Sequence, residues 1–246
     1  QKVTDKSLTF VGAGTDQTTW QILATDYYNN GDGWCDYSFQ NSESITFRNM
    51  TVIGGVDSNG NSTANNTQGL TYVQNITLED CVFKGRADYW GYTSTTFNNV
   101  TFYAPGTAES GIIWPDYSLW TYTGKTYTFI NCTFNSNGRT INVYRNPSSD
   151  GGSDSGSDSG SYNDVTVYFE NCTVNSIDAK EVSGAAKTAL NINDSNRKGY
   201  KYIIRISGDN KVTAAVDKTT CSRVFGFGGK EKEGTYNSGR TEVWVN

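Results

Sequence analysis

The chain of 246 residues contains no histidine, only 3 prolines and no apolar run long enough to cross a membrane as a helix. Without histidine, acid–base chemistry near neutral pH would depend on carboxylates, lysine, arginine or tyrosine. Acidic residues outnumber basic residues by 25 to 20, which gives a net charge of −5. This charge argues against a nucleic-acid partner, which requires a basic surface. Insertion into a membrane is not expected either.

The five cysteines form no CxxC pair, so a zinc site is not expected. Cys81, Cys132 and Cys172 share one position of a repeated pattern, whereas Cys35 and Cys221 lie outside it. We therefore expect the three repeated thiols to be buried and to pack as small apolar side chains.

A pattern of two short strands recurs five times along the chain. In each copy apolar residues alternate with threonine or polar residues, first before and then after an Asn or Asp. The copies cover residues 45–52, 76–83, 95–102, 125–134 and 167–174. Alternation with a period of two predicts strands, and a constant core separated by gaps of varied length is typical of a solenoid.

The Asn or Asp of each copy lies at a predicted corner between the two strands. These corner positions are Asn49, Asp80, Asn99, Asn131 and Asn171. Short amide and carboxyl side chains tolerate turn dihedrals and bond to nearby backbone. If the copies stack on one another, we expect these side chains to form a buried, hydrogen-bonded ladder.

The strand pattern and its Asn/Asp corners resemble the right-handed parallel β-helix of pectate-lyase-like proteins. This resemblance implies an all-β solenoid of about seven three-strand coils. Residues 1–246 are then a single β-helix domain. The third strands are expected at 70–72, 89–92, 111–114, 141–144, 190–192 and 224–227. We expect the ladder to be absent from residue 202 onward. Residues 241–245 should form a last strand, and further chain is expected to follow because no cap is evident there.

Long loops are predicted at 56–68, 115–124, 146–164 and 178–187. The loop at 146–164 is a low-complexity acidic insertion, in which Asp150, Asp154 and Asp158 recur every four residues. A Ca²⁺ site is one interpretation of this spacing. A flexible acidic loop is the preferred one, because the glycine-rich nonapeptide pattern of calcium-binding β-helices is absent. No metal or other cofactor is therefore assigned.

Aromatic residues gather in two successive predicted coils. Tryptophan and tyrosine provide flat apolar platforms with a polar handle, which suit sugar rings and protein hot spots. The alternative is that the 115–124 loop packs its own aromatic side chains together. The candidate ligand-binding residues are Trp90, Trp114, Tyr117, Trp120 and Tyr122.

A catalytic alternative places Asp88, Glu109 and Arg139 in one line, each just before the opening strand of its predicted coil, with Asp116 just after such a strand. A glycosidase needs two carboxyl groups about 5–10 Å apart. These residues also suit a surface row of ion pairs. The Asn-Thr-Asp, Asp-Asp and Gly-His-Gly motifs of polygalacturonase-like hydrolases have no match, nor has the Arg-x-Pro-x-x-Arg segment of pectate lyases. No catalytic residue is therefore assigned.

The coil pattern, carried by residues 7–14 and 125–134, is similar to adhesive domains of Gram-positive bacterial surface proteins. This similarity implies a non-catalytic module at the extracellular face of a bacterial cell, recognising a glycan or a host surface protein. It also implies a monomer within a longer multidomain chain. A polysaccharide lyase or glycoside hydrolase of the same fold is one alternative, and a structural stalk is another.

Overall fold

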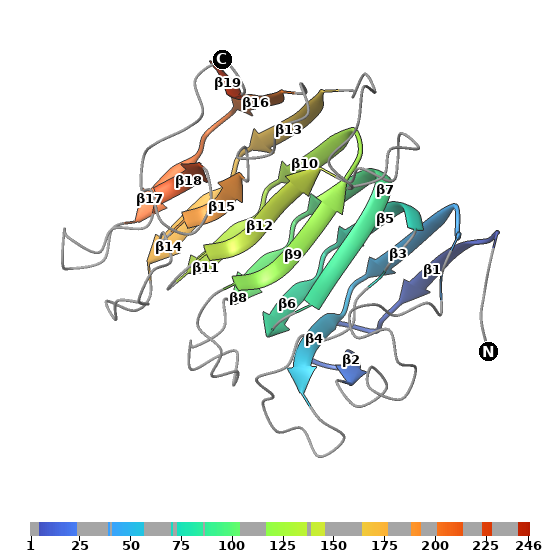
Figure 1. Ribbon diagram of the computed structural model, residues 1–246. Coiled ribbons are helices and arrows are strands. Elements are labelled where there is room, and N and C mark those ends of the chain that lie inside the picture. Colours follow the sequence, from blue (N-terminus) through green and yellow to red (C-terminus); the bar gives the residue numbers. More distant parts are fainter. Residues whose placement is uncertain are drawn as a thin grey trace.

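Figure 1 shows the computed structural model, in which strands stack in sequence order from β1 at one end to β19 at the other. The structure describes residues 5–23, 39, 41–56, 70, 73–85, 87–103, 117–136, 139–145, 164–176, 188–192, 201–213, 223–227 and 241–246. These residues contain strands and no helix, so the prediction of an all-β chain is confirmed for them. The described part therefore has no helix that could cross a membrane.

A 12-stranded sheet consists of two series of stacked strands that meet in the long strand β7 (Ala87–Asn98). The first series contains β1 (Ser7–Val11), β3 (Ser44–Arg48), β5 (Val73–Glu79), the end of β7, β10 (Thr126–Ile130), β13 (Val165–Glu170), β16 (Tyr202–Ser207) and β19 (Thr241–Val245). The second series contains the start of β7, β9 (Tyr117–Thr123), β12 (Arg139–Arg145), β15 (Thr188–Ile192) and β18 (Arg223–Phe227).

A smaller sheet of seven strands faces the first series. It contains β2 (Thr19–Leu23), β4 (Thr51–Val56), β6 (Val82–Gly85), β8 (Thr101–Tyr103), β11 (Thr133–Ser136), β14 (Thr173–Ser176) and β17 (Lys211–Thr213). Every pairing among the described strands is parallel. Along the chain, a strand of the first series is followed by one of the smaller sheet, an order consistent with a β-helix-like fold.

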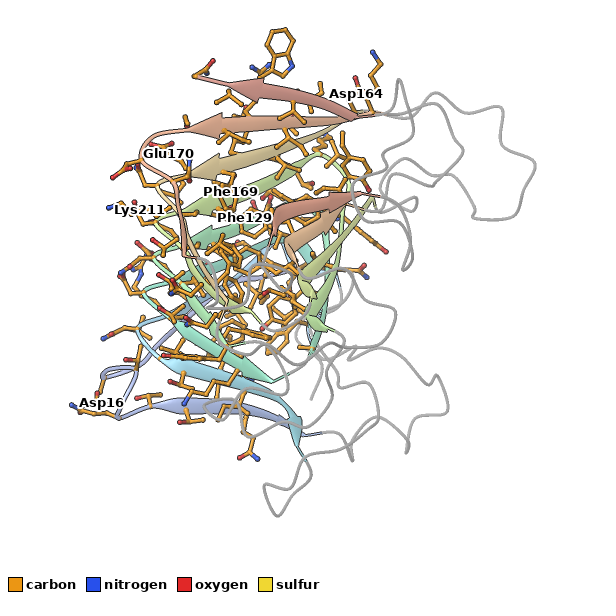
Figure 2. All side chains as sticks on the ribbon, turned by 90° about the vertical axis from the view of Figure 1, so that its left-hand side faces the viewer. Asp16, Phe129, Asp164, Phe169, Glu170 and Lys211 are labelled. Carbon is orange, nitrogen blue, oxygen red and sulfur yellow. The ribbon has the colours of Figure 1, made fainter. Side chains whose placement is uncertain are left out.

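The core lies between the two sheets and is built from register rows of identical or similar side chains. Phe97 is the register partner of Phe129, which in turn is the partner of Phe169, and all three are at most 1% exposed. The rings of Phe97 and Phe129 stack with centroids 5.2 Å apart. Figure 2 shows Phe129 and Phe169 among the other side chains between the strands. Parallel pairing at constant register thus turns a sequence repeat into a continuous aromatic core.

Five corner residues follow strands of the first series in left-handed backbone conformations, Asn49, Asp80, Asn99, Asn131 and Asn171, with φ between 51° and 56°. Asn and Asp adopt this region more readily than other residues with a side chain. The Nδ2 of Asn99 donates to Oδ1 of Asp80 over 2.7 Å. The prediction that these side chains are buried is wrong, because all but Asn49 are exposed. Figure 2 labels Glu170, the residue that directly precedes Asn171.

The same corner continues beyond the five copies with glycine in place of Asn. Gly208 follows Ser207, the register partner of Glu170, and has φ of 74°. The amide of the next residue, Asp209, donates to Oδ1 of Asn171 over 2.8 Å. The ladder was expected to be absent from residue 202 onward, but the backbone conformation of the corner continues at Gly208. Glycine adopts this left-handed conformation readily, although it has no side chain that could extend the ladder.

Two boundaries differ from the sequence prediction. Residues 117–123, predicted as part of a loop, form β9, because Leu119 and Thr121 alternate as buried inward positions. The segments predicted at 89–92 and 95–98 are one continuous strand, β7. The strand expected at 111–114 lies outside the described residues, while the strand expected at 241–245 is confirmed as β19.

Candidate functional site

Parallel pairing of β7, β9 and β12 aligns three aromatic positions in one register row. Trp90 is the backbone partner of Tyr122, and Tyr122 is the partner of Tyr144. We call positions 90, 122 and 144 the aromatic row. In each strand the preceding residue is buried, namely Tyr89, Thr121 and Val143.

A second row runs parallel to the aromatic row, two positions earlier in each strand. It consists of Asp88, Trp120 and Asn142, with Asn191 as the partner of Asn142 in β15. We call these positions the polar row. Two of the predicted ligand-binding residues, Trp90 and Tyr122, therefore share the aromatic row, and Trp120 lies in the adjacent one.

The remaining predicted binding residues do not share these rows. Tyr117 begins β9 and is the backbone partner of Arg139, and Trp114 lies outside the described residues. Tyr144 and Asn142 are not among the binding residues predicted from the sequence. The signal was present in residues 141–144, where buried Ile141 and Val143 alternate with these two positions.

The register separates the two described members of the catalytic alternative. Asp88 pairs with Trp120, whereas Arg139 pairs with Tyr117, three positions earlier in β9. Three positions in a strand correspond to about 10 Å. Asp88 and Arg139 therefore do not occupy matching register positions, as the predicted line requires. Glu109 and Asp116 lie outside the described residues.

The proposed calcium ligands are not part of the described structure. Asp150, Asp154 and Asp158 all fall in the segment between residues 145 and 164 that the structure leaves undescribed. The calcium alternative for the acidic insertion therefore stays a hypothesis.

Beneath the aromatic row, the core presents hydroxyl groups that are shielded from solvent. Tyr127 donates its hydroxyl to the carbonyl oxygen of Thr121 over 3.0 Å. Within the described residues, the hydroxyls of Tyr89 and Thr121 are buried without a hydrogen-bond partner. Burial raises the pKa of Tyr89 far above its usual value, so this phenol stays neutral. The layer beneath the row is thus uncharged and buried.

A glycine fixes the path of β7 next to the aromatic row. Gly91 directly follows Trp90, at the point where β7 passes from the second series to the first. A Cβ at Gly91 would lie 2.7 Å from the carbonyl oxygen of Ser94. Any larger residue would therefore displace the strand that carries Trp90.

The repeated cysteines contribute packing to the core. Cys81, Cys132 and Cys172 are free and buried, as predicted from their shared repeat position. Burial raises the pKa of the Cys81 thiol, which keeps it protonated at neutral pH. Cys35 and Cys221 lie outside the described residues.

A scan of protein-family models, a search of curated proteins and a search of solved structures each found no match for this chain.

Proposed function

We propose that the chain is a right-handed parallel β-helix of three-strand coils, one for each of the seven strands of the smaller sheet. The strand order and the uninterrupted parallel pairing support this arrangement. Right-handedness follows from the rule that parallel strands of one sheet are connected by right-handed crossovers. A rigid solenoid of this kind holds surface residues of successive coils at one fixed spacing.

The proposed function is that of a non-catalytic binding module that recognises a glycan through the aromatic row. The observation that carries this proposal is the alignment of Trp90, Tyr122 and Tyr144 as backbone partners in three adjacent strands. In a strand, successive positions belong to opposite faces, so positions next to the buried row are assigned to the outer face. Three strands at a spacing of about 4.8 Å place the outer two positions roughly 10 Å apart. Aromatic rings at this spacing suit successive sugar rings.

The polar row supports the same proposal. A sugar presents apolar C–H faces together with hydroxyl groups, so its recognition needs aromatic surface beside hydrogen-bonding groups. Asp88, Asn142 and Asn191 supply carboxylate and amide groups two positions from the aromatic row. The resemblance to adhesive domains leads us to place this module at the extracellular surface of a bacterium, within a longer chain. A host surface protein is the other partner that this resemblance implies.

A glycan array tests the proposal. The purified chain should bind a subset of neutral or acidic oligosaccharides, and a double variant, Trp120→Ala with Tyr122→Ala, should lose that binding. Tyr168→Ala is the matched control, because Tyr168 is an exposed aromatic residue of the first series, away from the site. Silence across the array, or equal loss in the control, would rule out glycan recognition by this row.

A further inference from the structure

The outer face of the first series carries two register rows of small hydroxyl and amide side chains. One row contains a threonine in five consecutive strands, Thr9, Thr46, Thr77, Thr96 and Thr128. The other, two positions earlier, contains Ser7, Ser44, Asn75, Ser94, Thr126 and Thr166. We call these two rows the threonine face. Inward positions between the rows, such as Ile45 and Ile76, are buried.

The hydroxyl groups of the central row are available to an external partner. In the described part of the chain, no hydrogen bond is formed by the side chains of Thr9, Thr46, Thr77, Thr96 or Thr128. Thr9 is exposed, and the other four are half-buried, since each is flanked by neighbours in the same row. The row therefore presents unpaired donors and acceptors at regular intervals.

The threonine face carries no charge, although charged residues lie along its margins. Glu43 directly precedes Ser44, and Arg48 and Glu79 lie two positions after Thr46 and Thr77 at the ends of their strands. Arg48 and Glu79 neutralise each other through an ion pair of 2.6 Å. An uncharged partner with many hydrogen-bonding groups is the electrostatic complement of such a face.

The positions form a two-dimensional lattice with little conformational freedom. Neighbouring strands are about 4.8 Å apart, and positions two apart in a strand are separated by about 6.6 Å. Threonine is branched at Cβ, so its χ1 angle is restricted and its hydroxyl and methyl groups take defined positions. The register is unbroken through β1, β3, β5, β7 and β10 at these rows.

Strand propensity alone does not account for this uniformity. Threonine is common on the solvent face of any sheet. The smaller sheet also has an outer row rich in threonine, which contains Thr51, Val82, Thr101, Thr133 and Thr173. The row beside it, however, contains Ile53, Lys84 and Tyr103 at successive register positions, which differ in size, charge and polarity. On the first series, by contrast, two adjacent rows carry small hydroxyl and amide side chains through the same five strands.

We propose that the threonine face binds the surface of ice. Ice presents an uncharged, rigid lattice of hydrogen-bonding groups that repeats on the same scale in two directions. A regular lattice of hydroxyl and methyl groups with restricted rotation matches such a solid better than it matches a flexible polymer, since each contact is repeated without a further ordering cost. Binding here would be independent of the aromatic row, which belongs to β7, β9 and β12.

Partition into slowly growing ice tests this proposal with the full chain and no label. A polycrystalline ice front is grown through a dilute solution, and the protein fraction in the ice is measured by absorbance. Thr96→Lys introduces a long cation in the middle of the lattice, and it should abolish the enrichment shown by the unchanged chain. Thr101→Lys is the matched control on the outer row of the smaller sheet, where Thr101 is equally half-buried. This control should retain the enrichment.

Crystal shape and the gap between melting and freezing temperatures, measured in a nanolitre osmometer, provide a second readout. Thr96→Val keeps the side-chain shape and removes only the hydroxyl, so it should fold normally and show a smaller gap than the unchanged chain. It decides the question if Thr96→Lys fails to fold. Exclusion of the unchanged chain from ice would overturn the proposal, as would equal enrichment of the Thr96 variants.

Two further measurements separate other occupants of the same face. Binding to insoluble neutral polysaccharide that Thr96→Lys abolishes, without partition into ice, would make the partner a polysaccharide and contradict the proposal. Concentration-dependent dimerisation that Thr96→Lys abolishes, again without partition into ice, would make the partner a second copy of the chain.

Discussion

Replacing Gly208 by alanine probes the corner between β16 and β17. Gly208 has φ of 74°, and an added Cβ would overlap Oδ1 of Asn171 and lie 2.8 Å from its Cγ. The same Oδ1 accepts a hydrogen bond of 2.8 Å from the amide of Asp209. Alanine would therefore have to adopt an unfavourable backbone conformation and displace the Asn171 side chain, which links this corner to the corner between β13 and β14.

The magnitude follows from these two contributions. The left-handed conformation costs a residue with a Cβ about 1–2 kcal/mol. Loss of the hydrogen bond between Asn171 and Asp209 costs about 0.5–1.5 kcal/mol. Together they amount to about 1.5–3.5 kcal/mol of unfolding free energy. For a chain of this size, that corresponds to a fall in Tm of roughly 3–14 °C.

Urea unfolding followed by circular dichroism measures the effect, and a double-mutant cycle separates its parts. Asn171→Gly keeps the left-handed preference at residue 171 and removes the side chain that the new Cβ would overlap. In that background, Gly208→Ala should cost only the conformational contribution of about 1–2 kcal/mol. An unchanged free energy of unfolding for Gly208→Ala would refute the corner geometry. Simple additivity in the cycle would refute the contact with Asn171.

Three further predictions concern the core and the surface. Phe129→Ala should lower the unfolding free energy by about 3–5 kcal/mol, because it leaves a cavity in the middle of the stacked aromatic core. Phe129→Leu should lower it clearly less. Equal losses for the two variants in urea titrations would contradict the packing described for Phe129. Burial raises the pKa of Cys81 and Tyr89 in the folded state. The unfolding free energy should therefore be unaffected by these groups below their unfolded pKa values, about 8.5 and 10, and should fall as pH rises above them, because the unfolded chain then loses protons that the folded chain keeps. A urea midpoint independent of pH from 8 to 11 would disprove this. Glu79→Gln should change stability by less than about 1 kcal/mol in thermal unfolding, because its ion pair with Arg48 is partly exposed; a larger loss would contradict this assignment.

The strands of the repeat were predictable because their alternation is strong. In residues 126–129 Tyr127 and Phe129 alternate with threonine, and in residues 165–169 every second residue is Val165, Val167 or Phe169. The structure buries all five of these side chains. Strand β9 was missed because its buried residues are Leu119 and Thr121, while the positions that alternate with them, Trp120 and Tyr122, are aromatic. Hydrophobicity alone therefore predicts that the two aromatic positions of β9 face the core. The buried register partners in the neighbouring strands, Ala87 and Ile141, show instead that Leu119 belongs to the inward face.

The continuation of the corner at Gly208 was missed for a different reason. The sequence pattern was built on a side chain, whereas the structure requires a backbone conformation that Asn, Asp and Gly all reach. The pairing of Trp90, Tyr122 and Tyr144 was also beyond sequence reasoning. The segments between these residues differ in length, so their alignment appears only once the strands are paired. The prediction that Asp88 and Arg139 align failed for the same reason.

The central claim is that Trp90, Tyr122 and Tyr144 act together as one binding platform. The most direct test is titration of a glycan identified on the array against three single variants, Trp90→Ala, Tyr122→Ala and Tyr144→Ala, with Tyr168→Ala as control. Each row variant should weaken binding by about tenfold, equivalent to 1.4 kcal/mol, and the control should bind normally. Unchanged affinity in the Tyr144 variant, the residue identified only from the register, would contradict the account.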